Sequence, residues 1–543
     1  MHIAKPKKQK KIAVIILIVL LDTLTRFLNL GNNSFWVDEL DHFFVGRSIN
    51  KNGQMLLPSG FEYSRARLYA YSVALSQKLF GANEFGTRAA SAFFGALTLL
   101  LVFWIINRLF SFRMALIVVF LLSIVPFEVG WSRISRFYSL FQLLTVLIWY
   151  LFLVALRDDR PAEGGIQRIR DIRVSAAVLF IAVFLLAISV QIITVFLLFP
   201  IALYFLYVGL DRFFADLQKK VLRVNFYLTV ILTGGLLVVA AFAVFPQLRE
   251  QIHYAVNYKP YWAIRGSASD RFLFLKFMMG KDLFPLGALF VLGFLQALIR
   301  RDRRIILGGL FFLGQVFLFT AVFSYRMFQY IYNVFPFLLL GAAYFLDRFI
   351  EEEKGAQVKP DAVNGRNRNL KIPALVFSGL LLFSPFVFRG AVVPFTPDGR
   401  SNGAVTFEEW KDASQFVKKL NLHDSDVVIC TLGLIPLYYL GQIDYVLNMA
   451  NYDLSVKDHR VDKEGRLIDF YSGKPFVKNV ADLERLVRQN ERGFLLLDVY
   501  RLRQPQNVPR EIHQWIRENL NLLYMTPNKS VVIYGWDNKA AGL

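Results

Sequence analysis

Two adjacent carboxylates, Asp38 and Glu39, lie in a short motif of the sequence FWVDELDH, residues 35–42. A carboxylate held against aromatic side chains can act as a general base. Adjacent residues point to different sides of a helix, so we expect only one of the two to face a reaction. The alternative is that Asp38 caps a helix over residues 39–50 while Trp36 anchors at the headgroups of a membrane.

A second motif, WSRISRFY at residues 131–138, contains two arginines. Arg133 and Arg136 are three residues apart, so on a helix they would share a face. Guanidinium groups bind phosphate through forked hydrogen bonds, which makes this pair a candidate phosphate site. The alternative is that both side chains extend toward lipid headgroups, as arginines at a membrane boundary commonly do.

A third motif, SYRMFQYIYNVFP at residues 324–336, carries polar side chains at helical spacing. Its polar members are Arg326, Gln329 with Tyr330, and Asn333. A polar stripe within a membrane faces a cavity or another helix. Pro336 interrupts the backbone hydrogen bonds and could open a groove at this point. Packing between helices is the alternative for the whole stripe.

Two smaller features complete the candidates. Residues 246–282 combine aromatic and polar side chains, which suits stacking on a sugar ring and equally suits an aromatic belt at a membrane interface. The members are His253, Tyr254, Tyr258, Lys259, Tyr261, Trp262 and Arg265. Asp22 and Arg26 are four residues apart within an apolar segment, and this spacing favours a structural ion pair.

The composition places these motifs in a membrane protein. Of 543 residues, 55% are hydrophobic and 19% charged, and the net charge is +21. Soluble domains are less apolar and more charged, about 25%. High hydrophobicity excludes a disordered chain, and a lone cysteine, Cys430, excludes a disulfide scaffold. The sequence contains no HExxH, CxxC, P-loop or GxSxG motif, so zinc hydrolases, kinases and serine hydrolases lose their usual support.

Long apolar runs predict about eleven membrane-spanning helices. They cover residues 12–30, 87–107, 114–130, 137–156, 174–190, 192–209, 224–245, 283–299, 305–323, 327–346 and 373–392. The first run follows five lysines and has no small-residue cleavage site before its polar exit, so we interpret it as an uncleaved anchor. With that basic tail in the cytoplasm, every loop predicted to be cytoplasmic is basic. Membrane topology therefore accounts for the positive charge, and nucleic acid is not an expected partner.

This topology depends on the segment 64–80, which is amphipathic and starts with Arg65 and Arg67. We place it along the outer membrane interface, because counting it as a span would invert every later loop. The outer side then receives the loops 31–86, 131–136 and 246–282. It also receives everything after residue 393.

Residues 393–543 form a second predicted domain. Helical patterns at 407–420, 480–489 and 509–520 alternate with β-rich runs at 426–430, 494–499 and 531–535. Such alternation predicts a small α/β domain. The expected fold is thus a polytopic α-helical membrane domain, residues 1–392, followed by an extracytoplasmic α/β domain, residues 393–543. Its expected location is the plasma (cytoplasmic) membrane, with many passes.

Together these features resemble the GT-C class of membrane glycosyltransferases, and within it the family 39 group, which includes protein O-mannosyltransferases and the lipid A aminoarabinose transferase. The resemblance covers about residues 12–346 and depends on short motifs. WVDE at 36–39 resembles the acidic pair of the family's first outer loop. The stretches 68–101, 132–140 (SRISRFYSL) and 326–336 resemble its later motifs.

The resemblance implies a polyprenyl-phosphate sugar donor, an acceptor on the outer face that is a protein, lipid or glycan, and inversion at the sugar. By analogy Asp38 is the general base. Arg136, Tyr138 and Arg326 hold the donor phosphate, and Glu39, His42 and Arg133 support them. The further substrate-binding candidates are Arg65, Arg67, Gln329, Tyr330, Tyr258, Lys259 and Trp262.

The chain departs from the family pattern in three places. Arg65 and Arg67 stand where the family has prolines, and Gln329 precedes Tyr330 where arginine is common. Ile134 occupies a position where relatives often carry an acid. A second carboxylate is therefore not assigned, and a divalent cation is compatible with the pattern but has no assigned ligands.

Two competing functions remain open. A transporter or flippase for a lipid-linked sugar would also need many spans, but transporters commonly show an internal repeat and paired broken helices, and we find neither in the sequence. A receptor would need only an anchor for the α/β domain, and eleven spans exceed that requirement.

Overall fold

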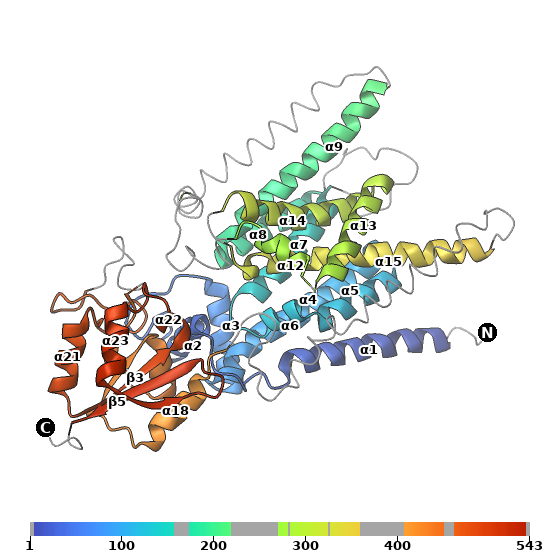
Figure 1. Cartoon of the computed structure of the whole chain (residues 1–543). Helices are drawn as coiled ribbons and strands as arrows, with labels where there is room; N and C mark the ends of the chain where they lie inside the picture. The colour runs from blue at the N-terminus through green and yellow to red at the C-terminus, as the bar shows by residue number, and fades with distance from the viewer. Residues whose placement is uncertain are drawn as a thin grey trace.

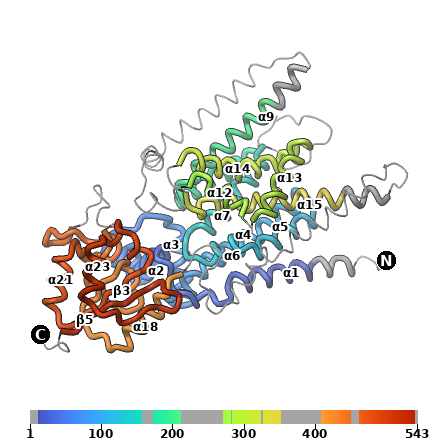
Figure 2. The backbone as a smooth tube through the Cα atoms, viewed as in Figure 1, coloured from blue at the N-terminus to red at the C-terminus, as the bar shows by residue number. Residues whose placement is uncertain are grey.

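The computed structural model describes residues 5–156, 173–218, 253, 270–280, 283–323, 326–358, 407–449 and 461–538. An elongated bundle of helices carries an α/β domain at one end (Figure 1). Helix α1 extends from this domain along the bundle, as the backbone tube also shows (Figure 2).

The first half of the bundle holds the acidic motif, residues 35–42, and the motif with two arginines, residues 131–138. Its helices are α1 (Lys5–Phe27), α2 (Val37–Asn52), α3 (Arg67–Phe80), α4 (Glu84–Leu109), α5 (Phe112–Ile124), α6 (Pro126–Ser132) and α7 (Tyr138–Ala155). Asn83 caps α4 by accepting a hydrogen bond from the Gly86 amide at 2.9 Å. Pro126 begins α6, and the axis bends by 65° between α5 and α6.

The second half of the bundle contains α8 (Val174–Val190), η1 (Ile192–Leu197), α9 (Leu198–Gln218), α12 (Leu273–Met278), α13 (Phe284–Arg300), α14 (Arg303–Ala321), η4 (Phe328–Val334) and α15 (Phe335–Val358). The segments η1 and η4 are 3₁₀ helices that lead directly into α9 and α15. The third sequence motif therefore has 3₁₀ rather than α-helical spacing over η4.

Five helical segments in the described part of the chain are long and apolar enough to cross a membrane. They are 84–109, 138–155, 192–210, 303–321 and 328–351, and the bent pair α5 and α6 is a sixth candidate. Two shorter apolar helices, α8 and α13, and the first helix α1 match three further predicted runs. The predicted runs 224–245 and 373–392 lie outside the described residues, so the count of eleven spans stays a prediction.

Three of the basic loops that we assigned to the cytoplasm, near residues 108–113, 300–304 and 347–351, meet at one end of the bundle. Arg113 forms ion pairs with Asp347 and, at 3.7 Å, with Glu351 at the far end of α15. Arg304 donates to the carbonyl of Leu109, at the end of α4. Loops far apart in the sequence thus share one bundle end, as the alternating topology requires.

Helix α3 is amphipathic, as predicted for an interfacial helix. Leu68, Tyr71, Leu75 and Leu79 are exposed, with fractions from 39% to 66%. Tyr69 and other residues of the opposite face are buried in the protein, where α3 contacts α2 and α4. An apolar face that no described residue covers suits the boundary of a lipid bilayer.

The C-terminal domain is a five-stranded sheet with helices. It contains α18 (Trp410–Lys419), β1 (Val427–Cys430), α19 (Leu434–Tyr439), β2 (Tyr445–Val446), α21 (Val480–Gln489), β3 (Arg492–Asp498), α22 (Val499–Leu502), α23 (Arg510–Asn519), β4 (Asn521–Met525) and β5 (Val531–Asp537). The strand order is β2-β1-β3-β5-β4. Strands β2, β1 and β3 are parallel, and β5 and β4 are antiparallel to their neighbours.

The predicted helices and β-rich runs of this domain are all present, although two strands were not predicted. Strand β2 has only two residues, which is too short for a periodic pattern. Strand β4 is a largely exposed edge strand, so its residues do not alternate between core and solvent. Burial of both faces made the other strands recognisable.

The domain is attached to the start of α2 and of α4. Phe35, Leu40 and Phe43 join the same hydrophobic cluster as Trp410 and Ile435 of the domain. At the other contact, the carboxylate of Glu84 accepts hydrogen bonds from two tyrosines and pairs with a lysine. These partners are Tyr438 and Tyr439, each at 3.0 Å, and Lys411, also at 3.0 Å.

Candidate active site

Asp38 lies in the first turn of α2 and keeps an accessible carboxylate. Its side chain is 41% exposed, and its Oδ2 atom is 3.7 Å from Nη2 of Arg136. Arg136 also donates from Nη1 to the backbone carbonyl of Asp38 at 2.9 Å. The positive end of the helix dipole adds to the arginine in stabilising a negative charge here. An accessible carboxylate beside a fixed cation can accept a proton from a substrate.

Glu39 has a different environment from its neighbour. Its side chain is buried, and Arg88 contacts its two oxygens at 2.8 Å and 2.7 Å. The same carboxylate accepts from the amides of Trp36, at 2.9 Å, and Ser135, at 2.7 Å. Glu39, not Asp38, therefore closes the N-terminus of α2, and the capping alternative for Asp38 is wrong.

Asp41 supplies a second carboxylate that the sequence motif contained but that we did not assign to the site. It lies one turn after Asp38 and is 8% exposed. Its Oδ2 atom is 3.4 Å from Nη1 of Arg136. Burial raises the pKa of Asp41 to about 7, while Arg136 lowers it and the charge of Asp38 raises it. The spacing of the two aspartates, three residues apart on a helix, was the signal that could have identified it.

Arg136 is the centre of the cluster. It is buried, its guanidinium lies 5.4 Å from the ring centroid of Phe137, and it interacts with Tyr138. Tyr138 in turn interacts with Gln329 of η4. The Nε atom of Arg136 is buried without a hydrogen-bond partner among the described residues. Arg136 therefore holds a buried positive charge beside two carboxylates, Asp38 and Asp41.

Arg133 does not accompany Arg136. Residues 133–137 form a turn between α6 and α7, so helical spacing does not apply and the expected shared face is wrong. Nη1 of Arg133 donates to the carbonyls of Thr25, at 2.8 Å, and Arg26, at 3.1 Å. These carbonyls lie at the C-terminal end of α1, which a cation stabilises. Arg133 thus has a structural partner rather than a shared site with Arg136.

The third motif contributes Gln329 rather than Arg326. Nη2 of Arg326 donates to the carbonyls of Thr320, at 2.8 Å, and Phe323, at 3.0 Å, and so closes the end of α14. No contact in the described part of the chain joins its guanidinium to Asp38 or Arg136. The expected convergence of Asp38, Arg136 and Arg326 is therefore found for the first two only.

The rest of this stripe packs between helices, as the alternative held. Tyr330 stacks on Phe319 with ring centroids 5.1 Å apart. The Asn333 amide bonds to Gln315 and Thr145.

His42 is buried within an aromatic shell. Its ring is 4.8 Å from Tyr69 and 5.5 Å from Tyr63, and neither nitrogen has a hydrogen-bond partner among the described residues. Burial and the neighbouring Arg136 hold the pKa of His42 well below its usual value. The neutral ring can pack against the cluster, but it offers no positive charge to a phosphate.

Arg65, which precedes α3, and Arg67, the first residue of α3, lie in different surroundings. Arg65 is exposed and interacts with the charges of Asp41 and Arg136, so it lies beside the cluster. Arg67 instead pairs with Glu62 at 3.4 Å, and both side chains are more than 60% exposed. Arg67 is therefore a surface residue whose ion pair lies in solvent.

Three predicted substrate residues, Tyr258, Lys259 and Trp262, lie outside the described residues. The described residues also contain no group of three histidine, cysteine, aspartate or glutamate side chains that could hold a metal ion. The ion pair expected in the first apolar segment is confirmed, because Nε of Arg26 is 2.8 Å from Asp22. Glu128 lies 3.8 Å from the same guanidinium.

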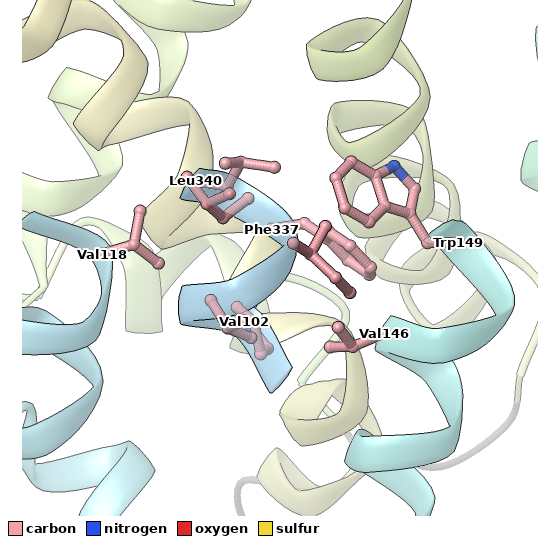
Figure 3. Close-up of a pocket in the computed structure, with 9 residues that line it drawn as sticks. Val102, Val118, Val146, Trp149, Phe337 and Leu340 are labelled. Atoms are coloured by element: carbon pink, nitrogen blue, oxygen red, sulfur yellow. The ribbon is translucent and has the colours of Figure 1, made fainter. Parts of the chain in front are cut away.

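A separate apolar pocket lies deeper in the bundle (Figure 3). Its lining includes Val102, Val118, Val146, Trp149 and Phe337, from helices α4, α5, α7 and α15. Val102 is fourteen residues after Arg88 on α4, a rise of about 21 Å along the helix. With only apolar residues and Trp149 around it, this pocket offers no partner to a phosphate.

Comparison with known proteins confirms the predicted resemblance to GT-C membrane glycosyltransferases. Residues 64–243 match the family model "Dolichyl-phosphate-mannose-protein mannosyltransferase". A search of curated proteins found no match. Among solved structures, ArnT from Cupriavidus metallidurans bound to undecaprenyl phosphate is 14% identical and has a TM-score of 0.57, with 96% of this chain and 97% of that chain covered.

An archaeal protein has a similar fold. The oligosaccharyltransferase AglB from Archaeoglobus fulgidus, in complex with an inhibitory peptide and a dolichol-phosphate, is 12% identical with a TM-score of 0.56. The alignment covers 97% of this chain and 74% of that chain. At these identities the likeness establishes the fold, which includes both the helical bundle and the C-terminal domain.

Proposed function

We propose that the protein transfers a glycosyl group from a polyprenyl-phosphate-linked sugar to an acceptor on the outer face of the membrane. The observation that carries this proposal is the juxtaposition of Asp38 and Arg136, a half-exposed carboxylate 3.7 Å from a buried guanidinium. The family match over residues 64–243, and a fold shared with a protein bound to undecaprenyl phosphate, support the choice of donor.

In this proposal Asp38 is the general base. It removes the proton from the acceptor hydroxyl as the oxygen attacks the anomeric carbon of the donor sugar, and the bond from that carbon to the phosphate oxygen breaks. Attack opposite the leaving phosphate inverts the anomeric centre. The exposed position of Asp38 allows an acceptor to approach, whereas the enclosed carboxylate of Glu39 has no free oxygen.

Arg136 is the proposed phosphate-binding residue, with Tyr138 and Arg65 beside it. The leaving phosphate gains negative charge in the transition state, so a fixed cation stabilises that state more than the bound donor. The exposed guanidinium of Arg65 can contact the phosphate directly, and the buried guanidinium of Arg136 adds its positive charge beside it. The lipid tail would extend into the bilayer from the same end of the bundle.

Glu39 and Arg88 have a supporting role in this proposal. Arg88 bridges Glu39 to the carbonyls of Leu30, Asn33 and Ser34 at 2.8–3.0 Å. It thereby fixes the loop before α2 and the direction in which Asp38 emerges. The same proposal places this end of the bundle and the α/β domain on the extracytoplasmic side of the plasma membrane. It also includes eleven spans in total.

The test is transfer by purified protein in detergent, using radiolabelled polyprenyl-phosphate sugars and membranes that lack this protein as the acceptor source. We expect wild-type protein to move label out of the lipid donor and Asp38→Asn to be slower by about 10²-fold or more. The exposed Glu62→Gln is the matched control. An Asp38→Asn variant that folds, binds donor and transfers at the wild-type rate would exclude this mechanism. A protein that moves lipid-linked sugar across vesicles without forming product would instead be a flippase.

A further inference from the structure

The loop between α2 and α3 contains a short β-hairpin that the α/β domain contacts. The amide of Leu57 donates to the carbonyl of Phe61 at 3.0 Å, and the amide of Tyr63 donates to the carbonyl of Met55 at 2.9 Å. These bonds pair the two arms of the segment across its turn. We refer to residues 55–63 as the hairpin.

A tight turn of the α/β domain, residues 469–473, lies against this hairpin, and we refer to it as the domain turn. Asp469 is buried and accepts from the amide and the hydroxyl of Ser472, at 2.8 Å and 2.7 Å, which fixes the turn. Gly473 has a φ angle of +74°, a conformation that favours glycine. The glycine also lets the two backbones approach closely, because a Cβ atom here would lie 2.9 Å from the Cα atom of Ser59.

Hydrogen bonds and ring stacking join the domain turn to the hairpin. The hydroxyl of Ser59 donates to the carbonyl of Phe470 at 2.6 Å, and the Ser59 amide donates to the carbonyl of Tyr471 at 3.2 Å. The rings of Phe61 and Phe470 lie parallel, with centroids 5.7 Å apart. Phe470 and Tyr471 also pack against a hydrophobic cluster that includes Tyr63. The domain therefore holds the hairpin through both polar and apolar contacts.

The hairpin in turn contacts the acidic motif through Tyr63. The ring of Tyr63 lies edge-on to the ring of His42, with centroids 5.5 Å apart. His42 follows Asp41, whose carboxylate is 3.4 Å from Arg136. Arg65 is two residues after Tyr63, so the chain keeps their Cα atoms within about 7 Å of each other. The end of the hairpin therefore determines where the guanidinium of Arg65 can lie relative to the cluster.

The chain turns directly after Arg65. Ala66 is buried and has a φ angle of +48°, a left-handed conformation that residues other than glycine rarely adopt. Such a conformation persists only where the surrounding structure determines it. Here the hairpin precedes it and α3, which begins at Arg67, follows it. The backbone at Arg65 is therefore held from both sides.

We propose that the domain turn holds the hairpin and thereby positions Arg65 for the donor phosphate, with Ser59 and Phe470 as positioning residues. This inference rests on the proposed function, in which Arg65 contacts the phosphate. Ordering a segment on binding costs free energy, and a backbone that is already fixed avoids this cost. The α/β domain thus contributes to donor binding without supplying a group that touches the donor.

The test is the donor KM and the kcat of full-length variants. Ser59→Ala removes a hydrogen bond to the domain turn, and Phe470→Leu removes the ring stacking. Each should raise the donor KM by about three- to tenfold, because binding must then order the hairpin. Once donor is bound the site is complete, so kcat should stay near the wild-type value.

Two matched controls accompany these variants. Ser72→Ala removes a hydroxyl that bonds within α3, to the carbonyl of Leu68 at 2.9 Å. Tyr500→Leu removes a ring of the α/β domain that is 63% exposed. Both should keep the wild-type donor KM, because neither residue belongs to the hairpin or to the domain turn.

A double-mutant comparison separates positioning from general damage. Arg65→Gln should raise the donor KM by about tenfold or more, since it removes a charged hydrogen bond to the phosphate. Ser59→Ala added to Arg65→Gln should raise the KM no further, because the lost hydrogen bond acts through the residue already removed. Two independent structural effects would instead multiply.

Each outcome decides the inference. Folded Ser59→Ala and Phe470→Leu variants with the wild-type donor KM, beside an Arg65→Gln variant that loses affinity, would overturn the positioning role and leave the proposed function intact. Effects of Ser59→Ala and Arg65→Gln that multiply would do the same. Melting curves in detergent verify folding. The two variants lie on opposite sides of the contact, so either one tests the inference if the other does not fold.

Failure of the proposed function has a different signature. An unchanged donor KM in Arg65→Gln would remove Arg65 from the phosphate site and overturn the inference with it. Transfer by Asp38→Asn at the wild-type rate would exclude the proposed mechanism, whatever the response of Ser59→Ala.

Discussion

Arg88 binds both carboxylate oxygens of Glu39, at 2.8 Å and 2.7 Å, although 49 residues separate them in the sequence. The pair is buried and lies directly behind the half-exposed Asp38. Of two adjacent acids, one therefore builds the site and the other is available for chemistry. The distinction arises because a single buried arginine satisfies only the acid that points toward α4.

Replacing Arg88 by methionine should destabilise the protein strongly. The change leaves Glu39 buried without a charge partner, and breaking such a pair costs about 3–5 kcal/mol. Thermal unfolding in detergent measures the loss. The double variant Glu39→Gln/Arg88→Met should recover much of it, because no charge then remains unpaired. A single variant as stable as wild type would show that the pair does not hold this loop.

Arg136 and Arg133 should give opposite results although they lie three residues apart. Arg136→Gln should weaken binding of a polyprenyl-phosphate donor and reduce transfer by about 10²-fold, the typical loss on removing a transition-state donor. Arg133→Gln should lower the melting temperature, since it removes two bonds to α1, without changing the donor KM. Donor titrations and melting curves on both variants distinguish a phosphate-binding role from a structural role. An equal loss of donor affinity in both variants would show that Arg133 also binds the phosphate.

Asp41 should make stability depend on pH. Its pKa in the folded protein, about 7, lies above the ordinary value for aspartate, about 3.9, so the folded state holds this proton more tightly. Stability contributed by the protonated form is full near pH 4 and is lost as the pH rises through 7. Asp41→Asn removes this loss, worth up to about 4 kcal/mol at pH 8.

Melting temperatures of Asp41→Asn and wild type should therefore differ more at pH 8 than at pH 4.5, with the variant gaining at high pH. Asp412→Asn, a change in α18 of the α/β domain, serves as the comparison. A difference that stays constant across this range would show that Asp41 is ionised throughout.

Glu84 should control the attachment of the α/β domain. It accepts from Tyr438 and Tyr439 and pairs with Lys411, so Glu84→Ala removes three contacts between the domain and α4. We expect faster hydrogen exchange in α19 and a lower rate of transfer, with α21 unaffected. Glu62→Ala, which removes only an exposed ion pair, is the control. Unchanged exchange in α19 would mean that the hydrophobic cluster alone holds the domain.

The sequence alone determined the class of fold and the general region of the site. Apolar runs must be helical in a membrane because backbone groups have no water to bond with. In residues 393–543, helical periodicity alternating with short β-rich runs specified helices and strands whose positions agree with the structure. The motif around Asp38 was recognisable because its acids and aromatics are neighbours in the chain. Local pattern carries this information, since it depends only on the spacing of side chains along one segment.

Only the tertiary structure decided which residues share the site. The turn at 133–137 sends Arg133 to α1 and Arg136 to α2, although an α-helix would have kept them on one face. Arg326 closes α14, while Gln329 reaches Tyr138. Arg88 contacts the acidic motif from a distant segment, for which the sequence around Asp38 carries no signal. These arginines need partners because they are buried: a charge removed from water must find an opposite charge or a hydrogen bond. The fold alone determines which partner is within reach.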